Sequence, residues 1–376
     1  MKKLSLFLLI ICLTQSIRTK ASDIVRIKSF DEHIIIGKLD LPEKSESISA
    51  LVIFIPGTGP NTYDNHRLIN GKEFTYYDLF AEEFNKIGVG FFRYNTRGVY
   101  VSKKPPMYDS VNAEEFKKSL PSNHIRDVEC LISEFRKDIR FKSSKIILLG
   151  WSEGTIIASM VAQRKNVNVD AIILAGYANE KVDDIMRWQL SGQSSMVQLN
   201  FYFDYDGDGR ISREEFEKGS TKIRKILFNN VSFNDIDTNK DNFFTLEDLK
   251  ERFEYNKKLV FDAIEKGNDE WLQKYYARIT SAWVKEHSRL MPNKETLLEV
   301  NIPIFVLHGE NDWNAPVEGV RDLEKRFLLN KKDNLNVFIY KKCDHDLNYS
   351  DYIKKGTIPE GISRIFSIVD EINKNK

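Results

Sequence analysis

Cysteine is scarce in this sequence, with three residues among 376, and one of them, Cys12, lies in an apolar stretch near the N-terminus. The other two, Cys130 and Cys343, are too few for a disulfide scaffold in a chain of this length, and whether they pair stays open. Charge of one sign is also lacking, since 56 basic and 55 acidic residues leave a net charge of +1. That balance gives no support for a nucleic-acid partner. After residue 21, no apolar run reaches the roughly 20 residues that a membrane-spanning helix needs.

The N-terminus has the order of segments that is typical of a secretory signal peptide. Two early lysines are followed by an apolar run over residues 4–13 and then by polar and small residues. We therefore predict a signal peptide over residues 1–21 and a secreted or periplasmic mature protein. A buried N-terminal strand or helix is the alternative.

Apolar runs alternate with segments of helical spacing along most of the chain. Residues 23–42 carry β-branched runs around a polar turn, which predicts a β-hairpin. Continuous apolar runs such as the one in residues 50–60 predict strands that are buried on both faces. Because strands alternate with helices, we predict an α/β fold with a mostly parallel sheet. The other expected strands lie within residues 89–102, 145–151, 169–177, 302–316 and 335–348, and the helices within 74–88, 123–139, 153–165 and 359–376.

Residues 181–300 break this alternation. Strand-like runs disappear there, and helical, highly charged sequence replaces them. A connection between two sheet strands normally takes a few residues, so an insertion of about 120 residues predicts a structure of its own. We predict a core formed by residues 22–180 and 301–376, with a helical cap over residues 181–300.

The sequence "GWSEG" at residues 150–154 fits the pattern G-x-S-x-G, between an apolar run and a helix rich in small residues. This context is typical of a serine held on a tight strand-to-helix turn. The glycines permit close backbone approach, and the helix N-terminus faces the negative charge that develops during acyl transfer. We predict that Ser152 is a catalytic nucleophile. A Gly-rich turn before an ordinary helix is the alternative.

A serine nucleophile needs a histidine base, and in this architecture the base follows both the nucleophile and the acid in the chain. Of the six histidines, only His308 and His345 follow the insertion. His345 lies in a polar loop after the last expected strand, and we predict that it is the base. His308 ends a strand just before Gly309, where we expect a structural role. A solvated surface histidine is the alternative for His345.

The acid that orients the base is expected in the loop after the preceding strand. Asp312, in "HGENDWNAP", is the predicted acid, although an Asn-Asp pair also forms turns. Glu310 of the same loop is a second candidate, and Asp183 or Asp184, after an earlier strand, is a third.

An oxyanion formed on the substrate needs two backbone donors. One is expected to be the N–H of Glu153, the residue after the nucleophile, and the other the N–H of Thr58, in the loop "GTGP". A simple turn is the alternative for that loop.

Taken in order, "PGTGP", "FFRYNTRGVYVS", "GWSEG", "HGENDWNAP" and "CDHDLN" resemble the motifs of the α/β-hydrolase fold, and most of all those of bacterial secreted esterases with a G-S-G-P-type loop. The resemblance covers residues 24–190 and 265–376. It implies an eight-stranded, mostly parallel core and hydrolysis of a small-molecule ester through an acyl-enzyme. The chain departs from that pattern at residues 61–64, where relatives often have R-D, and at Tyr100, where they often have a second Gly. These departures lie near the expected pocket, so the resemblance does not fix the substrate.

A different pattern lies inside the insertion. The sequence "DYDGDGRISREE" has acidic residues at its first, third and fifth positions, a Gly at the sixth and a Glu at the twelfth. This spacing surrounds Ca²⁺ with oxygen ligands, so we predict an EF-hand calcium loop. Its expected ligands, the fourth of them through its backbone carbonyl, are Asp204, Asp206, Asp208, Arg210, Ser212 and Glu215.

A second copy of the pattern follows at residue 237 with "DTNKDNFFTLED". Asn replaces Gly at the sixth position, and Asp replaces Glu at the twelfth, where its shorter reach predicts weaker binding. The eighth residues, Ile211 and Phe244, are apolar, as a short β contact between paired loops requires. We predict an EF-hand pair over about residues 195–258, with solvated acidic loops as the alternative. The expected ligands of the second loop are Asp237, Asn239, Asp241, Phe243, Thr245 and Asp248.

Together these patterns predict a secreted serine hydrolase, in the first place a carboxylesterase, that binds Ca²⁺ at two sites in its cap. A serine peptidase or aminopeptidase of the same fold would carry the same catalytic residues. A calcium-binding protein on an inactive hydrolase scaffold is a third interpretation, which the complete set of Ser152, Asp312 and His345 disfavours. The oligomeric state does not follow from these patterns.

Overall fold

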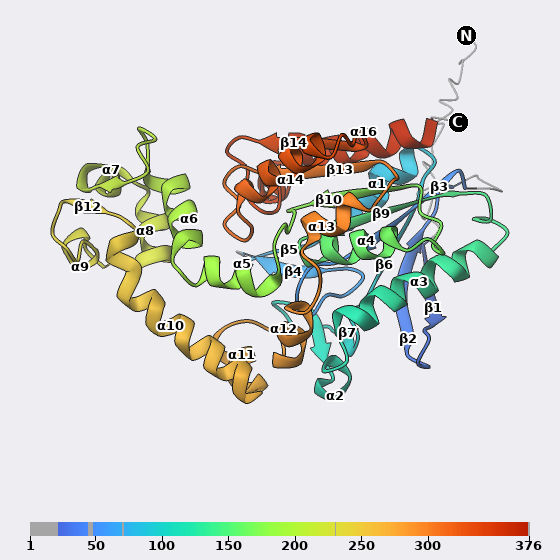
Figure 1. The fold of residues 1–376 in the computed structure, drawn as a ribbon, viewed down its shortest axis with the longest axis horizontal. Helices are drawn as coiled ribbons and strands as arrows, with labels where there is room; N and C mark the ends of the chain where they lie inside the picture. Colours follow the sequence, from blue (N-terminus) through green and yellow to red (C-terminus); the bar gives the residue numbers. More distant parts are fainter. Residues whose placement is uncertain (1–21, 44–47, 70, 230, 375–376) are drawn as a thin grey trace, which may run out of the picture.

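The computed structural model describes residues 22–43, 48–69, 71–229 and 231–374, and the predicted signal peptide lies outside them. One eight-stranded sheet organises the chain, with the strand order β1-β2-β6-β3-β9-β10-β13-β14 (Figure 1). Its strands are β1 (Ser22–Lys28), β2 (Ile34–Asp40), β3 (Ala50–Ile55), β6 (Gly90–Tyr94), β9 (Lys145–Trp151), β10 (Ala171–Ala175), β13 (Ile304–Gly309) and β14 (Leu335–Tyr340).

The strand directions confirm the predicted α/β fold with a mostly parallel sheet. β1 and β2 form an antiparallel hairpin in which Ile27 lies opposite Ile35, and β2 is antiparallel to β6. The pairs from β6 through to β14 are all parallel. β3 is buried at every position, as expected for a strand whose sheet is covered on both faces.

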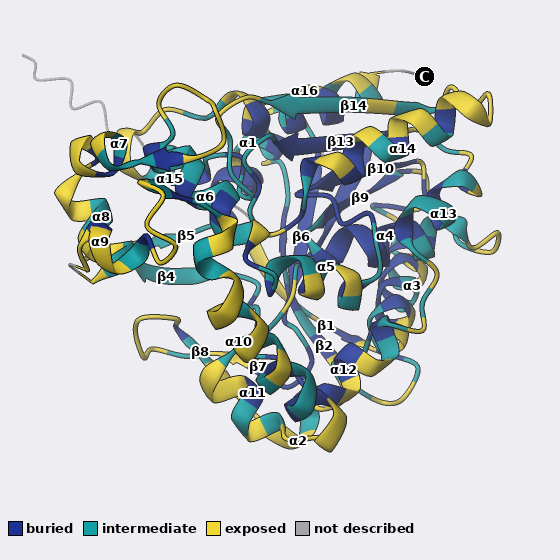
Figure 2. Ribbon diagram, turned by 60° about the vertical axis from the view of Figure 1, so that its left-hand side comes forward, coloured by how far each residue is buried: buried dark blue, intermediate teal, exposed yellow. Residues whose placement is uncertain are grey.

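Helices cover both faces of the sheet (Figures 1 and 2). On one face, α3, α4 and α14 pack with side chains of the strands into one hydrophobic cluster, and α1 and α16 form a second cluster on the other face. The two layers fix the position of every loop at the carboxyl ends of the parallel strands. Their bounds are α1 (Asp78–Lys86), α3 (Pro121–Lys137), α4 (Glu153–Gln163), α14 (Val317–Leu329) and α16 (Glu360–Lys374).

Short strands and helices lie within the loops of the core. The helix expected within residues 74–88 begins only at Asp78, because residues up to Thr75 pair with an earlier strand. Cys130 and Cys343 are both free thiols. The smaller elements are β4 (His66–Ile69), β5 (Lys72–Thr75), β7 (Val99–Val101), β8 (Asp109–Val111), α2 (Ala113–Phe116) and α15 (Tyr349–Lys355).

The segment between β10 and β13 is helical and contains two hydrophobic clusters. In the first, which we call the cap, α5, α11, α12 and the end of α10 pack on Ile156 and Ala178 of the core. The second, which we call the loop lobe (residues 193–249), lies away from the sheet at the left of Figure 1. The elements are α5 (Val182–Gln189), α6 (Gln193–Phe203), β11 (Ile211–Ser212), α7 (Arg213–Lys218), α8 (Thr221–Phe228), α9 (Phe233–Ile236), β12 (Phe243–Phe244), α10 (Leu246–Lys266), α11 (Asp269–Tyr275), α12 (Ser281–His287) and α13 (Asn293–Leu298).

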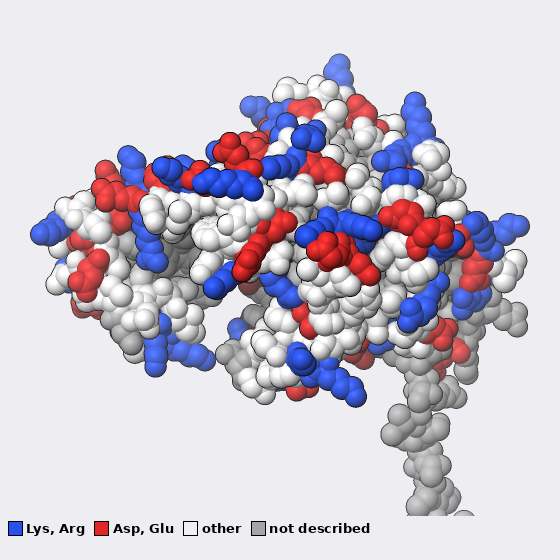
Figure 3. All heavy atoms as spheres, turned by 90° about the horizontal axis from the view of Figure 1, so that it is seen from below, with Lys and Arg blue, Asp and Glu red and all other residues white. Residues whose placement is uncertain are grey.

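Figure 3 shows one face of the molecule, on which acidic and basic side chains intermingle. This face is hollowed between the loop lobe and the remainder of the molecule. Among the described residues, no helix combines the length and the apolar character needed to cross a membrane.

Candidate active site

The predicted nucleophile lies at the turn from β9 into α4. Ser152 has φ 55° and ψ −120°, a conformation that residues with a side chain rarely adopt. A Cβ atom on Gly150 would lie 2.3 Å from the carbonyl oxygen of Gly154, and a Cβ atom on Gly154 would lie 2.1 Å from that of Ile55. Neither position accepts a side chain, so backbone packing behind Ser152 accounts for both glycines of the motif.

The predicted base and acid come together from the loops that follow β14 and β13. Nδ1 of His345 lies 2.7 Å from Oδ2 of Asp312. Asp312 is buried, and its Oδ1 accepts hydrogen bonds of 2.8 and 2.9 Å from the backbone N–H groups of Asn314 and Ala315. These contacts fix the carboxylate, which in turn orients the imidazole with Nδ1 as its donor and Nε2 free to accept a proton.

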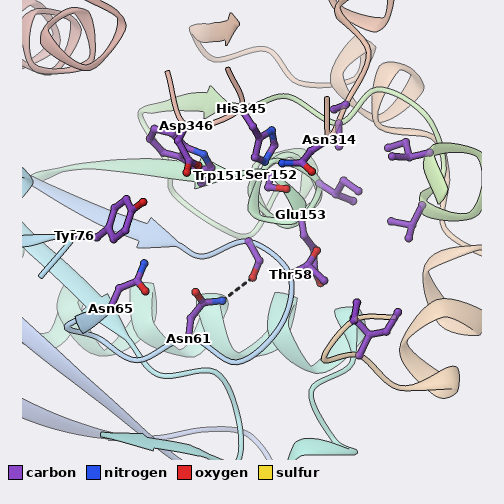
Figure 4. Close-up of a pocket in the computed structure, with 18 of the residues that line it drawn as sticks. Thr58, Asn61, Asn65, Tyr76, Trp151, Ser152, Glu153, Asn314, His345 and Asp346 are labelled. Atoms are coloured by element: carbon purple, nitrogen blue, oxygen red, sulfur yellow. Dashed lines mark hydrogen bonds between the residues drawn. The ribbon is translucent and has the colours of Figure 1, made fainter. Parts of the chain in front are cut away.

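Ser152 and His345 line the same pocket, which has a volume of about 490 Å³. Figure 4 shows the imidazole of His345 next to the side chain of Ser152. The core and the cap both contribute apolar walls, as is usual for a small-molecule site with a few convergent polar groups. These walls include Phe54, Tyr76, Phe80 and Trp151 from the core and Val182, Met186 and Trp283 from the cap.

The pKa of His345 reflects burial and three nearby carboxylates. Burial lowers the pKa of the imidazole, but Asp312, followed by Asp346 and Asp344, outweighs it and raises the pKa of His345 to about 9. Burial raises the pKa of Asp312, and the charge and hydrogen bond of His345 bring it below its ordinary value. The fraction of neutral imidazole, which is the form that accepts a proton, therefore grows as the pH rises toward 9.

The other candidates from the sequence have different surroundings. Nδ1 of His308 accepts a hydrogen bond of 3.0 Å from the N–H of Tyr177, and its Nε2 lies 3.1 Å from the carbonyl oxygen of Ala315. Both ring nitrogens are thus used within the protein, in line with the structural role expected for His308. Oε1 of Glu310 lies 3.5 Å from Nη2 of Arg321, with which it forms an ion pair. The remaining alternative acids, Asp183 and Asp184, lie in the first turn of α5.

The loop that carries Thr58 lies against the nucleophile. A Cβ atom on Gly57 would be 3.0 Å from Cβ of Ser152, and Figure 4 shows Thr58 below Ser152. The side-chain amide of Asn61 donates hydrogen bonds of 3.0 and 3.1 Å to the carbonyl oxygens of Gly57 and Gly59. Asn61 therefore holds this loop closed. The sequence marked it only as a departure from relatives.

The side chain of Glu153 makes a buried contact with the cap. Its Oε1 accepts a hydrogen bond of 2.8 Å from Nε1 of Trp283 and lies 2.9 Å from Nε2 of His287. Burial raises the pKa of Glu153, but the hydrogen bond and charge of His287 outweigh it, so the pKa lies below its ordinary value. Sequence reasoning missed this contact, because 134 residues separate Glu153 from His287.

Two further residues beside His345 were not predicted from the sequence. Gly176 has φ 58°, and a Cβ atom on it would lie 2.7 Å from the imidazole of His345. Asp346, the neighbour of His345, lines the pocket. Asp346 lies within the motif "CDHDLN", but its place in the pocket, like the contact of Gly176 with His345, depends on which loops meet there.

The two predicted calcium loops lie side by side in the loop lobe. Ile211 of β11 pairs with Phe244 of β12 in a short antiparallel ladder. Gly209 and Asn242, the sixth residues of the loops, have φ 82° and 68°, the left-handed conformation that a sharp turn requires. The backbone of both loops thus has the shape that the sequence pattern demands.

The first loop has the donor set that a hard cation prefers. Carboxylate oxygens of Asp204, Asp206 and Asp208 lie within 4.8 Å of one another. Glu215 accepts hydrogen bonds from backbone N–H groups of the same loop, and Arg210 forms an ion pair of 2.7 Å with Asp208. Since all donors are oxygens, the residues present fit Ca²⁺ and, less selectively, Mg²⁺.

The carboxylates of the second loop, like Asp204 in the first, accept hydrogen bonds from the backbone of their own loop. Asp237 accepts hydrogen bonds of 3.2 and 3.1 Å from the N–H groups of Asp241 and Asn242. Asp248 accepts hydrogen bonds of 2.8 Å from the N–H groups of Thr238 and Thr245. Among the described residues, a close group of three carboxylates forms only in the first loop.

Comparison with known families identifies the core. A family model of the α/β-hydrolase fold matches residues 50–352. The chain belongs to the α/β-hydrolase fold family. In this α/β hydrolase, the order of the eight strands and the position of Ser152 at the β9–α4 turn determine where the pocket lies. No curated protein matches the sequence significantly.

Solved structures share the fold of this α/β hydrolase at low sequence identity. A lipase in its open form is 14% identical, with a TM-score of 0.53, and the match covers 94% of this chain and 100% of the lipase. A thermostable carboxyl esterase from Bacillus coagulans, in complex with glycerol, is 15% identical, with a TM-score of 0.54 and coverage of 94% and 100%. An acylaminoacyl peptidase from Pyrococcus horikoshii is 14% identical, with a TM-score of 0.50 and coverage of 96% and 44%.

Proposed function

We propose that this α/β hydrolase is a serine carboxylesterase. The observation that carries the proposal is the pocket in which Ser152, on its strained turn, lies beside His345, whose Nδ1 is 2.7 Å from the buried Asp312. A nucleophile, a base and an orienting acid in this order meet the requirements for acyl transfer. The fold shared with a lipase and a carboxyl esterase supports the same class.

In the proposed reaction, Oγ of Ser152 attacks the ester carbonyl while Nε2 of His345 takes the hydroxyl proton. The carbonyl π electrons move to the oxygen, and the N–H groups of Thr58 and Glu153 stabilise this oxyanion. When the oxyanion collapses, the bond to the alcohol breaks, and His345 returns the proton to the leaving oxygen. Water then attacks the acyl-enzyme by the same steps, which releases the acid and restores Ser152.

Two experiments test the nucleophile and the reaction class. A fluorophosphonate probe should label the folded protein, and the Ser152→Ala variant should lose both the label and the hydrolysis of p-nitrophenyl esters. Labelling that persists in Ser152→Ala would refute the assignment of the nucleophile. An absence of labelling in folded, calcium-loaded wild type would instead favour a binding protein on an inactive hydrolase scaffold.

A serine peptidase is the second candidate, because the acylaminoacyl peptidase from Pyrococcus horikoshii shares the fold. Both activities use the same catalytic residues, so the site does not separate them. The two activities are separated by comparing kcat/KM for p-nitrophenyl esters with kcat/KM for aminoacyl p-nitroanilides. Ester hydrolysis without amide hydrolysis is the expected result, and the reverse would overturn the esterase proposal.

We also propose that the loop lobe binds two Ca²⁺ ions and that the protein acts outside the cytosol. The ligands would be the oxygens of the two loops, with Asp204, Asp206, Asp208 and Glu215 central to the first site. The paired loops and the close carboxylates of the first loop support this part. Calorimetric titration with Ca²⁺ should detect two sites, the second of lower affinity. N-terminal sequencing of protein exported by a bacterial host should begin near residue 22.

A further inference from the structure

The proposed reaction uses neither of the two carboxylates that line the pocket; that of Glu153 is bound by Trp283 and His287, which leaves that of Asp346. The backbone of Asp346 is engaged, since its N–H donates a hydrogen bond of 3.0 Å to Oδ1 of Asp344 and its carbonyl accepts one of 2.9 Å from Tyr349. Its side chain lines the pocket next to His345. Among the described residues, this carboxylate accepts no hydrogen bond, and the nearby cationic group that acts on it is the imidazole of His345. A partly desolvated anion without a hydrogen-bond partner is costly, and a cationic ligand would relieve that cost.

The charges around Asp346 have an excess of negative sign. Asp312, Asp344 and Asp346 surround the single imidazole of His345, and all three raise its pKa. Burial raises the pKa of Asp346 itself, and the charges of Asp344 and Asp312 add to this effect while His345 opposes it. Even with a protonated imidazole, three carboxylates leave this end of the pocket attractive to a further cation.

Aromatic rings line the same end of the pocket. Tyr76 stacks on Tyr349 with ring centroids 4.7 Å apart, Tyr349 stacks on Phe80 at 6.1 Å, and Phe80 meets Trp151 edge-on at 6.3 Å. All four rings line the pocket, and Figure 4 shows Asp346, Trp151 and Tyr76 on one side of Ser152. Aromatic rings beside a carboxylate form a combination that can bind an ammonium group, because both attract positive charge.

Besides the imidazole of His345, the pocket contains one cationic side chain, Arg67, which would attract an anionic substrate instead. Arg67 lines the pocket, and burial lowers the pKa of its guanidinium. However, its Nη1 already donates hydrogen bonds of 2.9 and 2.8 Å to the carbonyl oxygens of His66 and Met107. Arg67 is thus partly satisfied by the backbone, whereas Asp346 is not.

We propose that Asp346, with the rings of Tyr76 and Trp151, forms a subsite for an ammonium group, so that the preferred substrates are esters whose acyl or alcohol part carries a positive charge. This inference rests on the proposed esterase function, because it assigns one substrate group to a subsite of the same pocket.

Matched esters that differ only in charge test the subsite. On the alcohol side, the pair is choline acetate and its neutral isostere 3,3-dimethylbutyl acetate. On the acyl side, the pair is p-nitrophenyl 6-aminohexanoate and p-nitrophenyl heptanoate. For at least one pair, kcat/KM should be about tenfold higher for the cationic ester, the size expected where a cation meets ring faces and a carboxylate away from bulk water. In Asp346→Asn this ratio should fall to about one.

Each variant is judged by the ratio of its kcat/KM for the cationic ester to its kcat/KM for the neutral ester. An effect of the substitution on the chemical step changes both values equally and cancels in this ratio. Asp351→Asn is the matched control, because Asp351 lies five residues further along and forms an ion pair with Lys355 on the surface. That variant should keep the full ratio. Inhibition of neutral-ester hydrolysis by tetramethylammonium, compared with tert-butanol, gives a second readout that needs no variant.

The outcomes separate the subsite from the enzyme class. If neutral esters are hydrolysed but the cationic ratio is one in wild type, or survives in Asp346→Asn, the subsite is wrong and the esterase stands. If an anionic half-ester is preferred and the preference is lost in Arg67→Gln, the pocket selects the opposite charge and the proposal is overturned. If no ester of either pair is hydrolysed, the proposed function itself fails.

Discussion

Replacing His287 with alanine would test whether the cap supports Glu153, the residue that follows the proposed nucleophile. His287 lies at the end of α12, and its Nε2 is 2.9 Å from the carboxylate of Glu153. The N–H of Glu153 is a proposed oxyanion donor, so the side-chain contact and the catalytic donor belong to one residue. Loss of the contact should therefore affect both stability and turnover.

The expected loss of stability follows from the burial of this contact. Both side chains are buried, and after the substitution Oε1 of Glu153 would keep only the hydrogen bond from Trp283. A buried charged group left partly unpaired costs about 3 kcal/mol of unfolding free energy. In Glu153→Gln the charge is absent and the acceptor for Trp283 remains. The double variant should therefore be about 1–2 kcal/mol more stable than His287→Ala alone.

Urea unfolding followed by circular dichroism at pH 7 measures this difference, with His33→Ala, a histidine in the β1–β2 turn, as the control. The control should stay within about 0.5 kcal/mol of wild type. Because the pKa of Glu153 is lowered in the folded protein, the stability that it contributes is present at neutral pH and is lost as the pH falls through that lowered value. The kcat for a p-nitrophenyl ester should fall about tenfold in His287→Ala, with a smaller change in KM.

Two results would contradict this reasoning. A loss below about 1 kcal/mol in His287→Ala would show that the buried carboxylate finds other partners at little cost. A double variant no more stable than the single one would show that the charge of Glu153 is not the source of the loss.

Three further outcomes are expected. The kcat/KM should rise with pH to an inflection near 9, because the nearby carboxylates raise the pKa of His345 to about 9. The Asp346→Asn variant lacks one of these carboxylates, so its inflection should lie at lower pH. Gly154→Ala should destabilise the fold by about 3 kcal/mol in urea melts, because the new Cβ would overlap the backbone of Ile55; an unchanged melt would contradict the observed packing of the turn. Ca²⁺ at 100 times the dissociation constant of the first site should stabilise the loop lobe by about 2.7 kcal/mol through that site, and Glu215→Gln should lose most of this gain in thermal melts with and without EGTA.

The sheet could be predicted from the sequence because its strands are buried on both faces. A strand such as β3 is apolar at every position, so its run is easily recognised. The site residues Ser152, Asp312 and His345 could be predicted because they occur along the chain in the order that this fold requires. The structure brings Ser152 and His345 to one pocket, with Asp312 bound to Nδ1 of His345.

Contacts between distant segments could not be predicted in the same way. Asn61 holds its own loop through backbone carbonyls, which leave no mark in the sequence. The contact of Glu153 with α12 depends on how the cap packs, and periodicity within α4 or α12 does not encode that packing. The short strand β5 displaced the expected start of α1, because its pairing with β4 outweighs the helical spacing of residues 74–77.

The long helix α10 gives the loop lobe a mechanical connection to the substrate pocket. Its first turn is capped by Thr245 and Asp248, which are also expected ligands of the second calcium loop. Its far end carries Val260 and Ile264, which pack in the cap with the pocket residues Met186 and Trp283. A rigid rod of 21 residues is about 31 Å long, so a tilt of about 5° at one end moves the other by nearly 3 Å. We therefore expect that binding of Ca²⁺ by Thr245 and Asp248 would change the width of the pocket above Ser152 through a tilt of this helix.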